Sequence, residues 1–167
     1  MNVLRLVDKV FPSQTVFAHC DVPCGIYDPH QAQMAAHTVL RMTNMIDELQ
    51  ASSPEPPFEE RKRIISQISR LTKVKEEHAE LVKHEIRVIW GDYFKDEHLK
   101  QHKAIHQLVF KIMKQASVVR QNVDIKAANE LLIMVQQFAE IFWETKGRKV
   151  QKVKSGYPTE GEIVLPK

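Results

Sequence analysis

The chain has 167 residues, the usual size of one domain with its own core, and 24 Lys and Arg against 21 Asp and Glu give a net charge of +3. This slight basic excess does not indicate nucleic-acid binding, and no segment is long and apolar enough to predict a membrane span. Two cysteines exclude a disulfide framework and fit a reducing compartment, so we expect a cytoplasmic protein. Few glycines and aromatics, beside many Ala, Leu, Lys, Glu and Gln, favour an all-α fold.

Residues 1–18 precede the most informative part of the chain. Arg5, Asp8 and Lys9 interrupt their apolar residues, which argues against a secretory signal peptide. From composition alone this segment is an ordinary N-terminal arm.

Residues 19–27 bring together one histidine, both cysteines and two turn-forming residues. Pro23 fixes φ and Gly25 tolerates backbone angles closed to other residues, so Cys24 can be turned back toward Cys20. Thiolate and imidazole select soft or borderline metals, but structural zinc takes four side chains and the chain has no second ligand pair. Backbone nitrogen would complete the set, and an amide nitrogen beside thiolates favours square-planar nickel or copper. The segment therefore predicts an irregular N-terminal metal-binding hook.

Four amphipathic helices are predicted over residues 28–146. Asp28-Pro29-His30-Gln31 has the form of a helix start, and apolar residues follow at steps of three and four as far as Leu49. After the proline-rich connector 52–57, a second helix should run from about Phe58 to Trp90. A turn at residues 122–124 should separate the third and fourth helices. Such helices pack most simply as an antiparallel up-down four-helix bundle.

Residues 147–167 carry no helical pattern. Four cations lie within residues 148–154, and turn-forming residues follow at 155–158. We expect a basic, solvated and weakly ordered C-terminal extension rather than a nucleic-acid or membrane patch.

The hook and its downstream sequence resemble nickel-containing superoxide dismutase. His-Cys-Asp-Val-Pro-Cys-Gly-Ile-Tyr-Asp-Pro, residues 19–29, looks like the nickel hook that opens the mature chain of that family. Four further matches occur in family order: His-Ala-Glu-Leu-Val-Lys-His at 78–84, Trp-Gly-Asp-Tyr-Phe-Lys at 90–95, His-Gln-Leu-Val at 106–109 and Ile-Phe-Trp-Glu-Thr-Lys at 141–146. The resemblance also implies a four-helix bundle and a homo-oligomer, a hexamer in the family.

The resemblance implies how the hook holds one nickel ion per subunit. The thiolates of Cys20 and Cys24, the backbone nitrogen of Cys20 and the amine of His19 would form the square plane, with the His19 imidazole as axial ligand of the oxidised ion. A free amine at His19 requires a cut after Ala18, so residues 1–18 would be a propeptide removed by a dedicated peptidase.

The implied activity is the dismutation of superoxide to dioxygen and hydrogen peroxide by a ping-pong nickel(III)/nickel(II) cycle. Tyr27 and Tyr93 match positions that line the access to nickel, and tyrosine suits a gate because its ring excludes bulk while its hydroxyl holds ordered water. The backbone amides of Asp21 and Cys24 would donate to bound superoxide. Lys95 could help to attract the anion.

Two positions depart from the family pattern. Family members hold the axial histidine with a glutamate and an arginine, where this chain has Ala35 and His78. Losing both charges together avoids leaving one buried and unpaired, and we hypothesise that His78 itself reaches His19.

Two alternatives remain open from the residues. The hook could belong to a nickel or copper carrier, or to a thiol-based binding module, that lacks turnover. His98, His102 and His106 are spaced for a second metal site on a helix face, but no His-Glu-x-x-His motif accompanies them, and we do not expect metal there.

Overall fold

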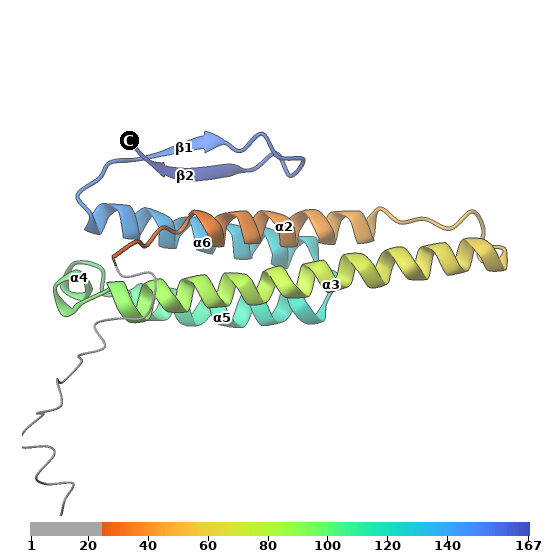
Figure 1. Ribbon diagram of the computed structural model, residues 1–167, viewed down its shortest axis with the longest axis horizontal. Coiled ribbons are helices and arrows are strands. Elements are labelled where there is room, and N and C mark those ends of the chain that lie inside the picture. The colour runs from red at the N-terminus through yellow and green to blue at the C-terminus, as the bar shows by residue number, and fades with distance from the viewer. Residues whose placement is uncertain (1–24) are drawn as a thin grey trace, which may run out of the picture.

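The protein is described here by a computed structural model, which describes residues 25–167. Four long helices lie side by side and alternate in direction: α2 (His30–Asp47), α3 (Phe58–Val88), α5 (Ile105–Gln121) and α6 (Ile125–Thr145) (Figure 1). Helix α2 contacts α3 and α6, and α5 contacts the same two helices, so the four close around one core. The predicted helical bundle is confirmed.

The helix starts follow the chemistry of the preceding residues. The backbone N–H of His30 donates to Asp28 Oδ1 at 2.7 Å, and Pro29 directly precedes the first helical residue. At the other end of the bundle, Asp124 Oδ1 accepts from the Ala127 N–H at 2.9 Å. Each carboxylate satisfies a backbone donor that has no partner inside its own helix.

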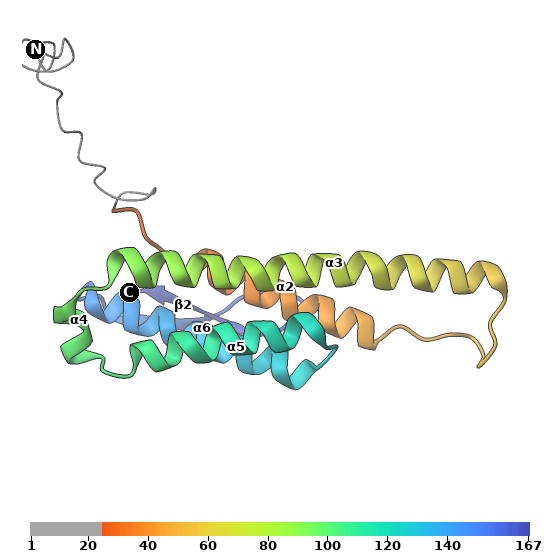
Figure 2. The same ribbon diagram turned by 90° about the horizontal axis from the view of Figure 1, so that it is seen from below.

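The connection between α3 and α5 is more structured than the sequence predicted. A π-helical turn, η1 (Ile89–Tyr93), continues α3, and a short helix, α4 (Asp96–Gln101), follows it at the end of the bundle (Figure 2). Phe94 leaves the turn in an extended conformation. π-Helical turns concentrate at functional sites, and this one carries Tyr93.

The core is apolar except at a few hydrogen-bonded positions. Lys75 on α3 is almost fully buried, and its Nζ donates to the carbonyl oxygens of Val119 and Asn122, at 2.6 Å each, and of Arg120 at 3.3 Å. The lysine thus caps the C-terminus of α5, where carbonyls lack helical partners and a positive charge is favoured. Burial lowers the pKa of this amine.

The predicted weak order of residues 147–167 is wrong. This segment forms a β-hairpin of β1 (Val150–Lys154) and β2 (Glu162–Pro166), paired antiparallel with Val150 opposite Pro166 and Lys154 opposite Glu162. The hairpin lies over α2 and α6 (Figure 1). The bundle therefore carries a small two-stranded sheet in addition to its helices.

Buried polar contacts from α2 and α6 hold the hairpin. Gln33 is fully buried and bonds both backbone groups of Val164: Nε2 donates to the carbonyl oxygen at 3.0 Å, and Oε1 accepts from the N–H at 2.8 Å. Gln136 Nε2 donates to the Glu162 carbonyl at 2.7 Å. These amides satisfy strand groups that water would otherwise have to solvate, and together with the buried side chains of Ile163 and Val164 they order the hairpin.

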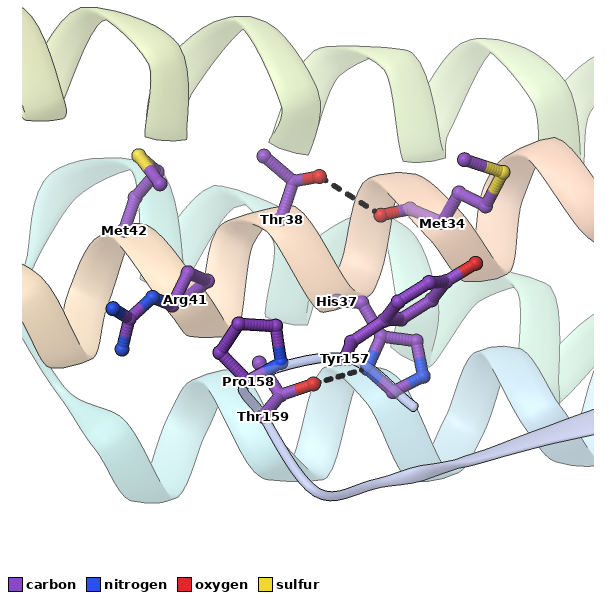
Figure 3. A pocket seen from close by; sticks show the side chains of 8 residues that line it. All are labelled: Met34, His37, Thr38, Arg41, Met42, Tyr157, Pro158 and Thr159. Carbon is purple, nitrogen blue, oxygen red and sulfur yellow. Dashed lines mark hydrogen bonds between the residues drawn. The ribbon is translucent and has the colours of Figure 1, made fainter. Parts of the chain in front are cut away.

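His37 fastens the turn of the hairpin beside a cavity of about 220 Å³ (Figure 3). Burial lowers the pKa of His37 and so favours its neutral ring. In that form Nε2, 3.0 Å from the Glu162 carbonyl, donates, and Nδ1, 2.8 Å from Thr159 Oγ1, accepts from that hydroxyl. A Cβ on Gly161 would lie 2.6 Å from His37 Cε1, so only glycine fits.

Within residues 25–167, no helix is long and apolar enough to cross a membrane.

Candidate metal centre

The predicted nickel ligands His19, Cys20 and Cys24, and the amide of Asp21, lie outside the described residues. The structure begins at Gly25, whose φ of +79° is the left-handed conformation that the sequence argument required of it. From there the chain passes Tyr27 and enters α2 at the end of the bundle that also carries η1, α4 and the C-terminus of α6 (Figure 1).

Tyr27 and Tyr93, the two predicted gate residues, lie in contact. Their ring centroids are 5.9 Å apart and their planes are inclined at 53°. Both rings are partly buried and pack against the hydrophobic core. The π-helical turn η1 directs Tyr93 to this position, although 65 residues separate the two tyrosines in sequence. The structure thus joins the two predicted gate residues at one end of the bundle.

The hydroxyl of Tyr93 is held by the last turn of α6. Thr145 Oγ1 donates to the Phe142 carbonyl at 2.7 Å, so it accepts the proton of the Tyr93 hydroxyl, 2.9 Å away. The Tyr93 ring packs against Phe142 at 4.8 Å and stacks on His98 at 5.2 Å with an interplanar angle of 15°. Tyr93 therefore has one fixed orientation.

Lys146 places a positive charge on the same cluster. Its Nζ lies 5.3 Å from the centroid of Tyr93, 4.8 Å from that of Phe142 and 5.9 Å from that of Trp143. Cation–π attraction of this kind holds an ammonium over ring faces. Sequence reasoning did not assign Thr145, Lys146 or His98 to the site. The sequence signal that could have identified Thr145 and Lys146 was their place at the end of the family match at residues 141–146.

Two buried polar atoms at this end of the bundle lack a hydrogen-bond partner among the described residues. They are Nδ1 of His30, in the first turn of α2, and Nε1 of Trp143, in the last turn of α6. Buried groups of this kind are usually satisfied in native proteins.

The two departures from the family pattern occupy different environments. Ala35 is buried in the core against its neighbours on α2. His78 is partly buried on α3, and its Nδ1 lies 2.8 Å from the Val74 carbonyl, to which it must donate. Nε2 is then the unprotonated nitrogen of the neutral ring. Its predicted partner, His19, is outside the described residues.

The second histidine set does not form a metal site. His98 Nδ1 accepts from the Lys95 N–H at 3.2 Å, His106 Nδ1 accepts from Trp90 Nε1 at 3.0 Å, and His102 lies 4.0 Å from Glu144. A helix break at residues 102–104 separates the three. No cluster of three potential metal ligands occurs among residues 25–167.

Comparison with known proteins decides the family. The model of the family described as nickel-containing superoxide dismutase matches residues 14–146. The chain belongs to the nickel-containing superoxide dismutase family. The resemblance inferred from sequence is thereby confirmed, with the activity and the nickel cofactor that it implied.

Relatives in this family match over nearly their whole length. The nickel superoxide dismutase of Streptomyces coelicolor is 38% identical over 142 residues, which cover 84% of this chain and 98% of that protein. That of Streptomyces seoulensis is 37% identical with the same coverage. A native nickel superoxide dismutase structure superposes with a TM-score of 0.64 at 35% identity, covering 77% of this chain and 99% of that one. The hairpin lies beyond the residues that the family model matches.

Proposed function

We propose that the chain dismutates superoxide at a nickel ion held by His19, Cys20 and Cys24, after residues 1–18 are removed. The donor set carries this proposal, because two thiolates, an imidazole and a terminal amine in one short hook fit nickel and do not complete a zinc site. Bound nickel supplies a one-electron couple that oxidises one superoxide to dioxygen and, with two protons, reduces the next to hydrogen peroxide.

We infer that Tyr27 and Tyr93 control access to the nickel ion and the protons near it. Their rings are in contact, and the hydrogen bond to Thr145 keeps the Tyr93 hydroxyl in place. We infer that the amides of Asp21 and Cys24 donate to superoxide as it arrives. Superoxide is an anion, so a nearby fixed cation raises its local concentration. Lys146, over the Tyr93 ring, suits this role better than Lys95.

His78 is proposed to steady the His19 imidazole. Its Nδ1–H is committed to Val74, so the ring is held in one orientation and presents Nε2 as an acceptor. The variant His78→Ala should change the electron paramagnetic resonance spectrum of the nickel site. An unchanged spectrum together with unchanged nickel content and activity would remove His78 from the site.

The assembly and location are proposed from the same reasoning. We expect a homo-oligomer, a hexamer as the family resemblance implies, and processing by a dedicated peptidase. We propose a cytoplasmic location, because two thiols that bind metal must stay reduced. Neither nucleic acid nor a membrane is expected as a partner.

The deciding experiment compares processed, nickel-loaded wild-type protein with Cys20→Ser and Cys24→Ser. Both variants should lose nickel and superoxide dismutation, whereas His102→Ala, which changes a histidine outside the hook, should retain nickel. Mass spectrometry of the active protein should find an N-terminus at His19. Nickel binding without turnover would favour the carrier, and an active chain that still begins at Met1 would contradict the amine ligand.

A further inference from the structure

Helix α3 extends well past the rest of the bundle. At about 1.5 Å per residue its 31 residues span about 46 Å, whereas α5, with 17, spans about 26 Å and α2, with 18, about 27 Å. The excess is the N-terminal part of α3, which runs beyond the ends of α2, α5 and α6 (Figure 2). None of residues 58–74 is buried, and the first buried residue of the helix is Lys75. We call residues 58–72 the α3 extension.

The α3 extension exposes large apolar side chains on one side. Phe58 and Ile65 are each 64% exposed and Ile68 is 38% exposed. Their spacing of seven and then three residues places them on one helical face. Within residues 25–167, this face has no partner helix, although three large apolar residues at helical spacing are typical of a packed surface.

A groove continues the same side of α3 toward the bundle. It has a volume of about 470 Å³ and is lined by Ser69, Thr72, Lys73, Glu76, Glu77, Glu80 and Arg120. Glu80 already pairs with Arg120 at 2.9 Å and with Arg87 at 3.2 Å. Glu76 and Glu77 give the groove an acidic edge. Among the described residues, the only ion pair of Glu77 is one with Lys73 at 3.8 Å, and both side chains of that pair are exposed.

Between residues 61 and 80 the charges of α3 form two separate blocks. Residues 61–73 contain Arg61, Lys62, Arg63, Arg70 and Lys73 and no acid, and residues 76–80 contain three glutamates and no lysine or arginine. Glu59, just before the basic block, pairs with Lys62 at 2.9 Å. Two copies of α3 that cross antiparallel near Ser69 would each place Arg61 and Lys62 against Glu76 and Glu77 of the other copy. Both pairs of positions lie about 11 Å from that crossing point along the helix.

We propose that the α3 extension is a docking surface for a second copy of this chain. The two copies pair about a two-fold axis near Ser69, with the apolar face of each extension covered by the other copy and each basic segment in the partner's acidic groove. Such self-complementary contacts are the usual form of two-fold interfaces. The proposal rests on α3 alone and does not depend on the nickel chemistry.

Charge reversal with complementation tests this contact. The variants Arg61→Glu/Lys62→Glu and Glu76→Lys/Glu77→Lys each place like charges together, so each should have a lower molar mass than the wild type in multi-angle light scattering at low salt. An equimolar mixture restores opposite charges at both contacts and should recover the wild-type mass. Lys100→Glu/Lys103→Glu, an equal charge change at the opposite end of the bundle, should keep the wild-type mass.

Circular dichroism melting separates loss of contact from loss of folding. Variants that melt like the wild type and regain mass only on mixing support the proposal. A monomeric wild-type chain would overturn it. So would charge-reversal variants that keep the wild-type mass, or folded variants whose mixture stays at the lower mass.

Discussion

Replacing Gln33 with leucine tests why the C-terminal hairpin is ordered. Gln33 contributes two buried hydrogen bonds, to the N–H and the carbonyl of Val164, and both residues are fully buried. Leucine has a similar size but satisfies neither group. Each buried unsatisfied backbone group costs about 1–3 kcal/mol, so the two cost about 4 kcal/mol at the middle of that range. The added apolar burial offsets about 1 kcal/mol.

The net loss of about 3 kcal/mol corresponds to a roughly 100-fold shift toward an undocked hairpin. The helices need not unfold, because an undocked hairpin regains hydrogen bonds to water. Hydrogen exchange followed by mass spectrometry should therefore show faster exchange in β1 and β2, with little change in α3 and α5. Gln137→Leu makes the same chemical change at an exposed position of α6 and should leave exchange near the wild-type rate. Unchanged hairpin exchange in Gln33→Leu would refute the assigned role of the two bonds.

Three further predictions concern single residues. Lys75→Met leaves the carbonyls at the end of α5 without their buried donor and should lower the free energy of unfolding by roughly 2–4 kcal/mol in denaturant titrations; an unchanged midpoint would contradict the cap. His37 has a pKa lowered from 6.5 by burial, so the unfolded chain takes up its proton first as the pH falls. Protection of the hairpin amides from hydrogen exchange should be full above about pH 6.5 and should decline below it toward the lowered pKa of His37. This pH dependence should weaken in His37→Gln. A wild-type chain whose hairpin protection does not change with pH would contradict this role of His37. Lys146→Gln should lower kcat/KM for superoxide by roughly two- to five-fold at low ionic strength and flatten its salt dependence, whereas Lys154→Gln on the hairpin should not. Equal effects of the two lysine changes would argue against a local role for Lys146.

The local sequence predicted the helices because their signals are short-range. Asp28 and Asp124 precede helices in the sequence and bond the backbone at those helix starts in the structure. The end of α3 was less predictable. The π-helical turn at Ile89–Tyr93 depends on where Tyr93 packs, and no periodic pattern encodes that position.

The sequence by itself identified the nickel-binding family, because the predicted donors of the hook are neighbours along the chain and form a recognisable motif. It did not reveal that Thr145 holds Tyr93, because a hydrogen bond across 52 residues exists only after the helices pack. The hairpin is the clearest case of this difference. Its first strand is basic and polar, its second strand buries Ile163 and Val164, and it is held by Gln33 and His37, more than 120 residues earlier in the chain. Tertiary structure decides such elements because buried polar side chains offer the strand partners that water would otherwise supply.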